Sequence, residues 1–167
     1  MAIALSLLVV SMLAVIAYQD FRYREVLVWY FVILFVASLP LVTKAVDFKT
    51  LLVNSIVNVC IVTFQLVVLT LYFSLKNKTV TNIFNNYLGV GDIVFFLVCC
   101  VWFSPMNFVC FFLAALVTSL LIQSVLRFKT IPLAGIMAVM LVLVVGMSTF
   151  ASIDFQSDVF LCNIMSL

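Results

Sequence analysis

Long apolar runs, separated by short clusters of charged residues, organise the whole chain. A helix needs about 20 predominantly apolar residues to cross the hydrocarbon core of a membrane. The uncharged stretch 93–126 is too long for one crossing, and Ser104-Pro105 divides it because proline cannot continue a helix. The pattern therefore predicts six membrane helices, with approximate bounds 1–19, 26–43, 50–75, 88–104, 105–126 and 131–150.

The fourth of these helices carries an aspartate near its start. The run 93–104 alone is too short to cross, so we expect the helix to begin near Leu88. That start brings Gly89-Val90-Gly91-Asp92 into the edge of the bilayer, with the carboxylate about one turn inside. A second aspartate, Asp20, ends the first apolar run. Charges at such depths are costly to keep and are by default functional-site candidates.

Composition supports lipid as the solvent of this chain. Hydrophobic residues make up 68% of the sequence and charged residues only 8%, too few to cover the surface of a soluble domain. No basic residue precedes the first apolar run, so we read 1–19 as a retained span and not as a cleaved signal. We expect one all-α membrane domain over 1–167.

The distribution of basic residues predicts the orientation, because short cytoplasmic loops carry an excess of Lys and Arg. With the N-terminus outside, the inner loops hold six basic residues and the outer side two. The inner set is Arg22, Arg24, Lys76, Lys78, Arg127 and Lys129, and the outer set is Lys44 and Lys49. Asp20 and Asp92 then both lie at cytoplasmic helix ends, where they can meet.

The residue types present restrict the chemistry. Histidine is absent, which excludes His-based metalloprotease motifs and Ser–His or Cys–His nucleophile pairs. The five cysteines form no C-x-x-C pair and are expected to be buried structural thiols, so we predict no metal and no cofactor. Two neighbouring carboxylates can share one proton and activate a water for attack on a peptide carbonyl.

Simpler interpretations stand beside these. Asp20 is also explained as an interface residue that ends a helix and pairs with Arg22 or Arg24. Phe95, Phe96 and Cys99, one to two turns beyond Asp92, are expected to pack in the core, with a substrate groove as the alternative. Three polar residues of the third helix fall within about 40° of one another and are expected to hydrogen-bond inside the bundle: Asn54, Asn58 and Gln65.

Glycines on both sides of Val90 add to the Asp92 motif. Glycine permits positive φ and has no side chain, so an extended peptide can approach the backbone at Gly89 and Gly91 closely.

Taken together, three motifs resemble those of the type IV prepilin peptidases, intramembrane aspartic peptidases with a Gly-x-Gly-Asp motif. They are Asp20-Phe21-Arg22-Tyr23-Arg24 after the first span, Gly89-Val90-Gly91-Asp92 opening the fourth, and Ile131-Pro132 entering the sixth. The resemblance implies that Asp20 and Asp92 are the catalytic pair. It also implies removal of a basic leader from prepilin-like precursors at the cytoplasmic face of a prokaryotic inner membrane.

The resemblance has departures and limits. Val94 stands where many members have a basic residue, and Glu25-Val26-Leu27-Val28 replaces an Ile-Pro-Asn run, which bears on substrate preference. The cysteine-paired region that larger members use for N-methylation is not matched. Partners are expected to be a precursor protein and membrane lipid, with no nucleic acid.

Two other functions remain open at this stage. One is a catalytically silent relative that acts as a membrane scaffold. The other is a small proton-coupled transporter using Asp20 and Asp92 as relay groups, although transporters usually place polar groups near the midplane and show an internal repeat.

Overall fold

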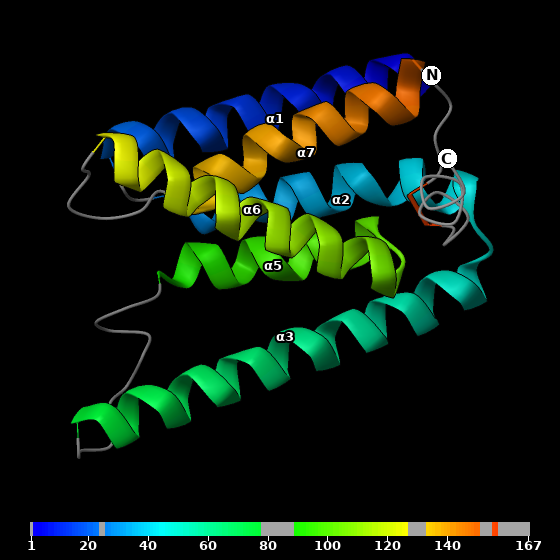
Figure 1. Cartoon of the computed structure of the whole chain (residues 1–167). Coiled ribbons are helices and arrows are strands. Elements are labelled where there is room, and N and C mark those ends of the chain that lie inside the picture. Colours follow the sequence, from blue (N-terminus) through cyan, green and yellow to red (C-terminus); the bar gives the residue numbers. More distant parts are fainter. Residues whose placement is uncertain (1, 24–25, 78–88, 127–132, 151–154, 157–167) are drawn as a thin grey trace, which may run out of the picture.

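The computed structural model describes residues 2–23, 26–77, 89–126, 133–150 and 155–156, and within these ranges the chain is all-helical with no strand. This confirms the predicted fold class (Figure 1). The helices are α1 (Ala2–Tyr23), α2 (Val28–Ala45), α3 (Phe48–Asn77), α5 (Val90–Trp102), α6 (Pro105–Leu126) and α7 (Leu133–Phe150).

Helix boundaries follow the predicted ones closely, with two corrections. Helix α1 does not stop at Asp20 but continues to Tyr23, because an acidic residue ends an apolar run without ending the helix. Helix α5 begins at Val90 and not near Leu88, because Gly89 is extended, with φ −70° and ψ 144°. Helix α6 begins at Pro105 as predicted, where proline suits a first turn. Ile131-Pro132 lies outside the described residues.

Within the described part of the chain, three helices are long and apolar enough to cross a membrane: α1, α3 and α6 over Ala4–Tyr23, Phe48–Lys76 and Pro105–Ser124. Helices α2, α5 and α7 contain shorter apolar segments. These lengths are those of a multi-pass membrane protein. Six crossings and an outside N-terminus remain predictions.

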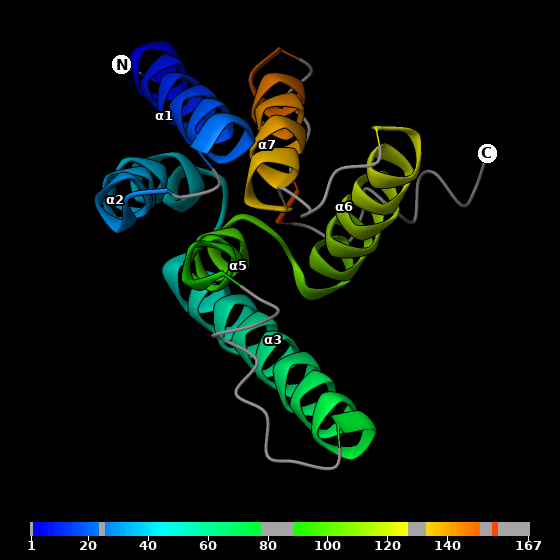
Figure 2. The same ribbon diagram turned by 90° about the vertical axis from the view of Figure 1, so that its left-hand side faces the viewer.

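The helices run roughly side by side, with α1, α2, α5 and α7 forming the centre (Figures 1 and 2). Helix α1 packs against α7 and α2, while α5 lies between α2 and α3 and also contacts α7. Helix α6 packs on α7, and α3 extends away from the others toward its C-terminal end (Figure 2). The ends of α1, α3 and α6 and the starts of α2, α5 and α7 share one end of the molecule, at the left of Figure 1.

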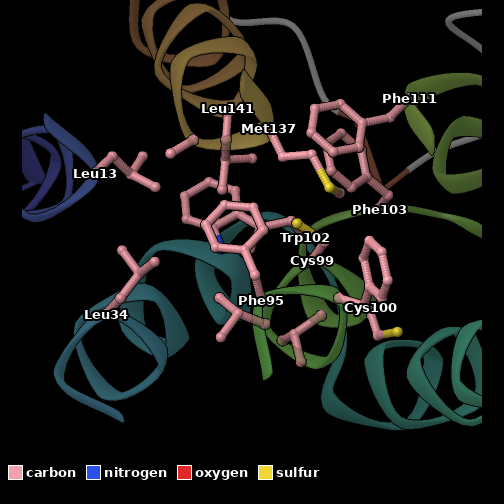
Figure 3. Close-up of a cluster of buried hydrophobic side chains, with 14 of the residues drawn as sticks. Leu13, Leu34, Phe95, Cys99, Cys100, Trp102, Phe103, Phe111, Met137 and Leu141 are labelled. Carbon is pink, nitrogen blue, oxygen red and sulfur yellow. The ribbon is translucent and has the colours of Figure 1, made fainter. Parts of the chain in front are cut away.

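Side chains from four helices meet in the core. Leu13 of α1, Leu34 of α2, Phe95 of α5 and Leu141 of α7 are fully buried and point toward a common centre (Figure 3). The ring of Phe95 packs edge-on against Phe31, with centroids 5.9 Å apart. Such contacts are apolar and hold the helices together by close packing.

The expectation of core packing beyond Asp92 is confirmed. Phe95, Phe96 and Cys99 are all buried within the apolar cluster. Among the described cysteines Cys100 is also buried, but Cys60 and Cys110 are exposed, so the expectation of uniformly buried thiols is wrong for those two. Their helices have outer faces that meet no other described helix, and a cysteine there behaves as a small apolar side chain.

Two of the three polar residues predicted to bond inside the bundle, Asn54 and Asn58 of α3, make internal hydrogen bonds as expected. The Asn58 amide donates to two carbonyl oxygens, Cys100 O at 2.9 Å and Phe103 O at 2.8 Å. The Asn54 amide donates to Gln156 Oε1 at 3.1 Å, and Gln65 is half-buried. Helix α3 is therefore anchored by hydrogen bonds where α5 ends.

Candidate functional site: two aspartates at the start of α7

Asp20 belongs to the buried face of α1. Val9, Leu13 and Ile16 precede it at spacings of four and three residues and are fully buried. This spacing repeats along one side of a helix, so the Asp20 side chain points inward with them. It is only 8% exposed. The periodicity that buries this face of α1 therefore also carries a carboxylate into the bundle.

Arg22 lies on the exposed side of the same helix. Its Nη1 donates to the Tyr18 hydroxyl, and its guanidinium lies 5.7 Å from the Tyr18 ring centre and 5.5 Å from that of Tyr23. Arg22 is thus engaged by two tyrosines, which weakens the interpretation of Asp20 as an interface residue paired with Arg22. Arg24 lies outside the described residues.

Asp92 sits in the first turn of α5 and is half-buried. Gly89 precedes the helix in an extended conformation, and its carbonyl oxygen accepts a hydrogen bond from Asp92 N at 3.1 Å. A carboxylate in a first turn is favoured by the positive end of its own helix dipole.

Both carboxylates are held by neighbouring backbone amides of α7. Ala134 N donates to Asp92 Oδ1 at 3.0 Å, and Gly135 N donates to Asp20 Oδ2 at 2.6 Å. The first N–H groups of a helix have no partner within it, so two of them are available here. Because the amides are consecutive, Asp20 and Asp92 lie at one helix terminus, where two negative charges would repel each other. The structure thus brings the two predicted residues together.

Gly135 makes this approach possible, and the sequence reasoning missed it. A Cβ built on Gly135 would stand 3.0 Å from Asp20 Oδ2, 3.2 Å from Phe21 Cε2 and 3.3 Å from Asp20 Cβ. These separations are shorter than ordinary van der Waals contact, so only glycine lets α1 come this close to α7. A signal existed in the sequence, since glycine in the first turns of an apolar helix carries a cost that close packing explains.

The two glycines of the Gly-x-Gly-Asp motif differ from each other. Gly89 is exposed, and a Cβ there would lie 3.4 Å from Asp92 Oδ2. At Gly91 the added atom would meet only the Phe31 ring, at 3.7 Å. Neither has a positive φ, so conformational freedom is not what these positions need. Close approach of a peptide stays a prediction, and Gly89 is the position open to it.

The arrangement suits proton transfer between a carboxylic acid and a carboxylate. Two acidic groups at one partly buried helix terminus favour a state with a single shared proton, in which one group accepts a proton and the other donates. Among the described residues, no group of three or more His, Cys, Asp and Glu side chains is placed to hold a metal ion.

Comparison with known protein families identifies the family of this chain. Residues 7–124, more than half of the chain, match the model of the type IV leader peptidase family. The chain belongs to this family. No curated protein and no solved structure matched the chain. The family match includes Asp20 and Asp92 but ends before α7, so the two amides that hold them come from outside the matched residues.

Proposed function

We propose that this protein is an intramembrane aspartic endopeptidase that removes the basic leader peptide from type IV prepilin-like precursors. The observation that carries the proposal is the placement of Asp20 and Asp92 on adjacent amides of α7. Family membership supports proteolysis of the leader-peptidase type.

In the proposed mechanism the pair holds one proton. The ionised aspartate takes a proton from a water molecule while the water oxygen bonds to the carbonyl carbon of the scissile peptide. The protonated aspartate donates a hydrogen bond to the carbonyl oxygen, which carries the developing negative charge. Collapse of this intermediate breaks the C–N bond, and a proton held by the pair passes to the leaving amine. The products are a carboxylate and a protonated amine, and the pair again holds one proton.

Backbone atoms of α7 contribute to this proposal by orientation. The Ala134 and Gly135 amides each occupy one oxygen of an aspartate, which fixes the direction of the other. Fixed geometry of this kind lowers the barrier because less reorganisation is needed at the transition state. The exposed, extended Gly89 beside Asp92 Oδ2 provides the approach for a substrate peptide.

The location of the pair suits a substrate whose cleavage point lies at a membrane boundary. Asp20 is near the end of α1, whereas Asp92 and the two amides are near the starts of α5 and α7. The charge distribution of the loops favours the cytoplasmic side for this end. A precursor with a basic leader followed by an apolar helix would present its junction at that depth.

The test is cleavage of a prepilin precursor by the purified chain in detergent or liposomes, followed by a gel shift. Asp20→Asn and Asp92→Asn should each abolish cleavage, and the double variant should be no worse than either, because the two act as a unit. Asp47→Asn is the matched control, since Asp47 is exposed between α2 and α3 at the opposite end.

The outcomes separate the candidate functions. Full activity of Asp20→Asn would end the aspartic peptidase proposal. Absence of cleavage by every variant, with proton flux that depends on both aspartates, would favour the transporter. Absence of both activities in a folded protein would favour the silent scaffold.

A further inference from the structure

Helix α5 ends inside the protein and needs partners there. Its 13 residues make it about 20 Å long, shorter than the hydrocarbon core of a membrane. Pro105 starts α6 directly after the break, so the last carbonyl groups of α5 have no helical N–H to accept from. In apolar surroundings each unsatisfied carbonyl is costly.

Two amide side chains cap this end. Asn58 Nδ2 bonds to the carbonyl oxygens of Cys100 and Phe103, and Gln156 Nε2 bonds to that of Val101. Asn58 is fully buried and Gln156 nearly so. Three carbonyl groups within about one turn of backbone are thus satisfied, two by α3 from one side and one by the short segment 155–156 from the other.

The same short segment also holds the turn and the neighbouring helices. Phe155 O accepts hydrogen bonds from Ser104 N at 3.0 Å and from Asn107 Nδ2 at 2.9 Å. Gln156 Oε1 accepts from Asn54 Nδ2 at 3.1 Å. Residues 155–156 therefore connect α3, the end of α5 and the start of α6, and they lie outside the residues matched to the family.

The position of α5 along its axis depends on hydrogen bonds at its two ends. Between them its contacts are apolar, such as the edge-on packing of Phe95 against Phe31, and apolar contacts are not directional. At one end Asn58 binds the carbonyl oxygens of Cys100 and Phe103 and Gln156 binds that of Val101. At the other end Asp92 Oδ1 is bound to Ala134 N. A helix of 13 residues transmits a shift at one end to the other.

We propose that Gln156 is a positioning residue for Asp92. By capping Val101 O beside the two carbonyl groups held by Asn58, it helps to set the axial position of α5 and so the alignment of the Asp92 carboxylate with Ala134 N. The inference rests on the proposed function, because it assigns Gln156 to the same reaction. It places a determinant of cleavage at the end of the molecule opposite the aspartates.

Steady-state cleavage of a prepilin precursor by the full chain tests this. Gln156→Met keeps the length of the side chain but removes the hydrogen bonds to Val101 O and Asn54 Nδ2. It should lower kcat about tenfold or more while leaving KM within about twofold. Asn54→Leu is the matched control. It removes the bond to Gln156 Oε1 but leaves the Val101 cap intact, so kcat should change by less than about threefold.

Thermal unfolding of both variants is measured in parallel. Unchanged kcat in Gln156→Met, or equal kcat losses in the two variants, would overturn the inference and leave a purely structural role. If Gln156→Met does not fold, Gln156→Asn replaces it. Its amide sits one methylene short of Val101 O, so kcat should fall, and a parental kcat would overturn the inference.

The parent and Asp92→Asn serve as references for the proposed function. No cleavage by the parent would end the proposed function itself. If the parent and Gln156→Met cleave at the same rate and Asp92→Asn does not cleave, the inference about Gln156 is wrong and the proposed function stands.

Discussion

Replacement of Gly135 by alanine tests the site most directly, because it adds one carbon atom where α1 and α7 touch. The new Cβ would stand 3.0 Å from Asp20 Oδ2 and 3.3 Å from Asp20 Cβ. Phe21 Cε2, at 3.2 Å, belongs to a ring that is 41% exposed and can turn aside. The Asp20 Cβ cannot, because it is attached to the backbone of α1. The helices must separate by a few tenths of an ångström, or the carboxylate must rotate.

Either response weakens the hydrogen bond from Gly135 N to Asp20 Oδ2, now 2.6 Å long. A hydrogen bond to a charged group contributes about 1.5–3 kcal/mol to stability. Alanine offsets part of this loss, because it is about 1 kcal/mol better than glycine inside a helix. We therefore expect the free energy of unfolding to fall by about 0.5–2 kcal/mol. Misplacement of the carboxylate should lower the cleavage rate by about 10- to 100-fold.

The same substitution elsewhere on α7 provides the control. A Cβ added to Gly146 would meet nothing within 4 Å. Gly146→Ala should therefore keep full activity and unfold at the same temperature or a slightly higher one. Precursor cleavage and thermal unfolding in one detergent compare the two variants. Cleavage by Gly135→Ala at the parental rate would refute the close approach of Asp20 to α7. Equal losses of cleavage in Gly135→Ala and Gly146→Ala would show that the effect comes from any glycine replacement in α7 and not from the contact with Asp20.

Gly89→Leu should abolish cleavage, because its side chain would cover Asp92 Oδ2, whereas Gly91→Ala adds only an ordinary contact at 3.7 Å and should stay active in the same gel assay. Equal effects at the two glycines would contradict this geometry. The cleavage rate should rise and then fall with pH, since only the singly protonated pair of Asp20 and Asp92 is competent; a flat profile would count against the shared proton. An impermeant thiol reagent should label a cysteine introduced at Lys78 only from the cytoplasmic side, and labelling from outside would reverse the topology.

The helices could be predicted from the sequence because lipid imposes a simple length requirement on apolar runs. Pro105 marks the start of α6, and the predicted bounds of α2 and α3 agree with the structure within about two residues. The end of α1 was harder to predict. Asp20 ends the apolar run, but its carboxylate is bound by Gly135 N, so the helix continues through it to Tyr23.

The two aspartates could also be predicted as a pair, since isolated carboxylates at membrane depth stand out against an apolar background. The groups that bind the two carboxylates could not be predicted from the sequence. Main-chain N–H groups occur at every residue, so no side-chain pattern marks Ala134 and Gly135 as donors. The role of Gln156 was hidden for a similar reason, because its partner is the carbonyl oxygen of Val101. Long-range contacts between side chains and backbone depend on how helices pack, which periodicity does not reveal.

The electrostatics of α7 explain why a pair of aspartates, and not one, is useful at its start. The N-terminus of a helix carries roughly half a positive charge. This is enough to favour one carboxylate but not to balance two full negative charges held on adjacent amides. A single proton shared by the pair is therefore favoured over two full charges at this terminus, and one such proton is what the proposed mechanism requires. On this argument α7 does more than position Asp20 and Asp92, because its terminus favours one negative charge over two.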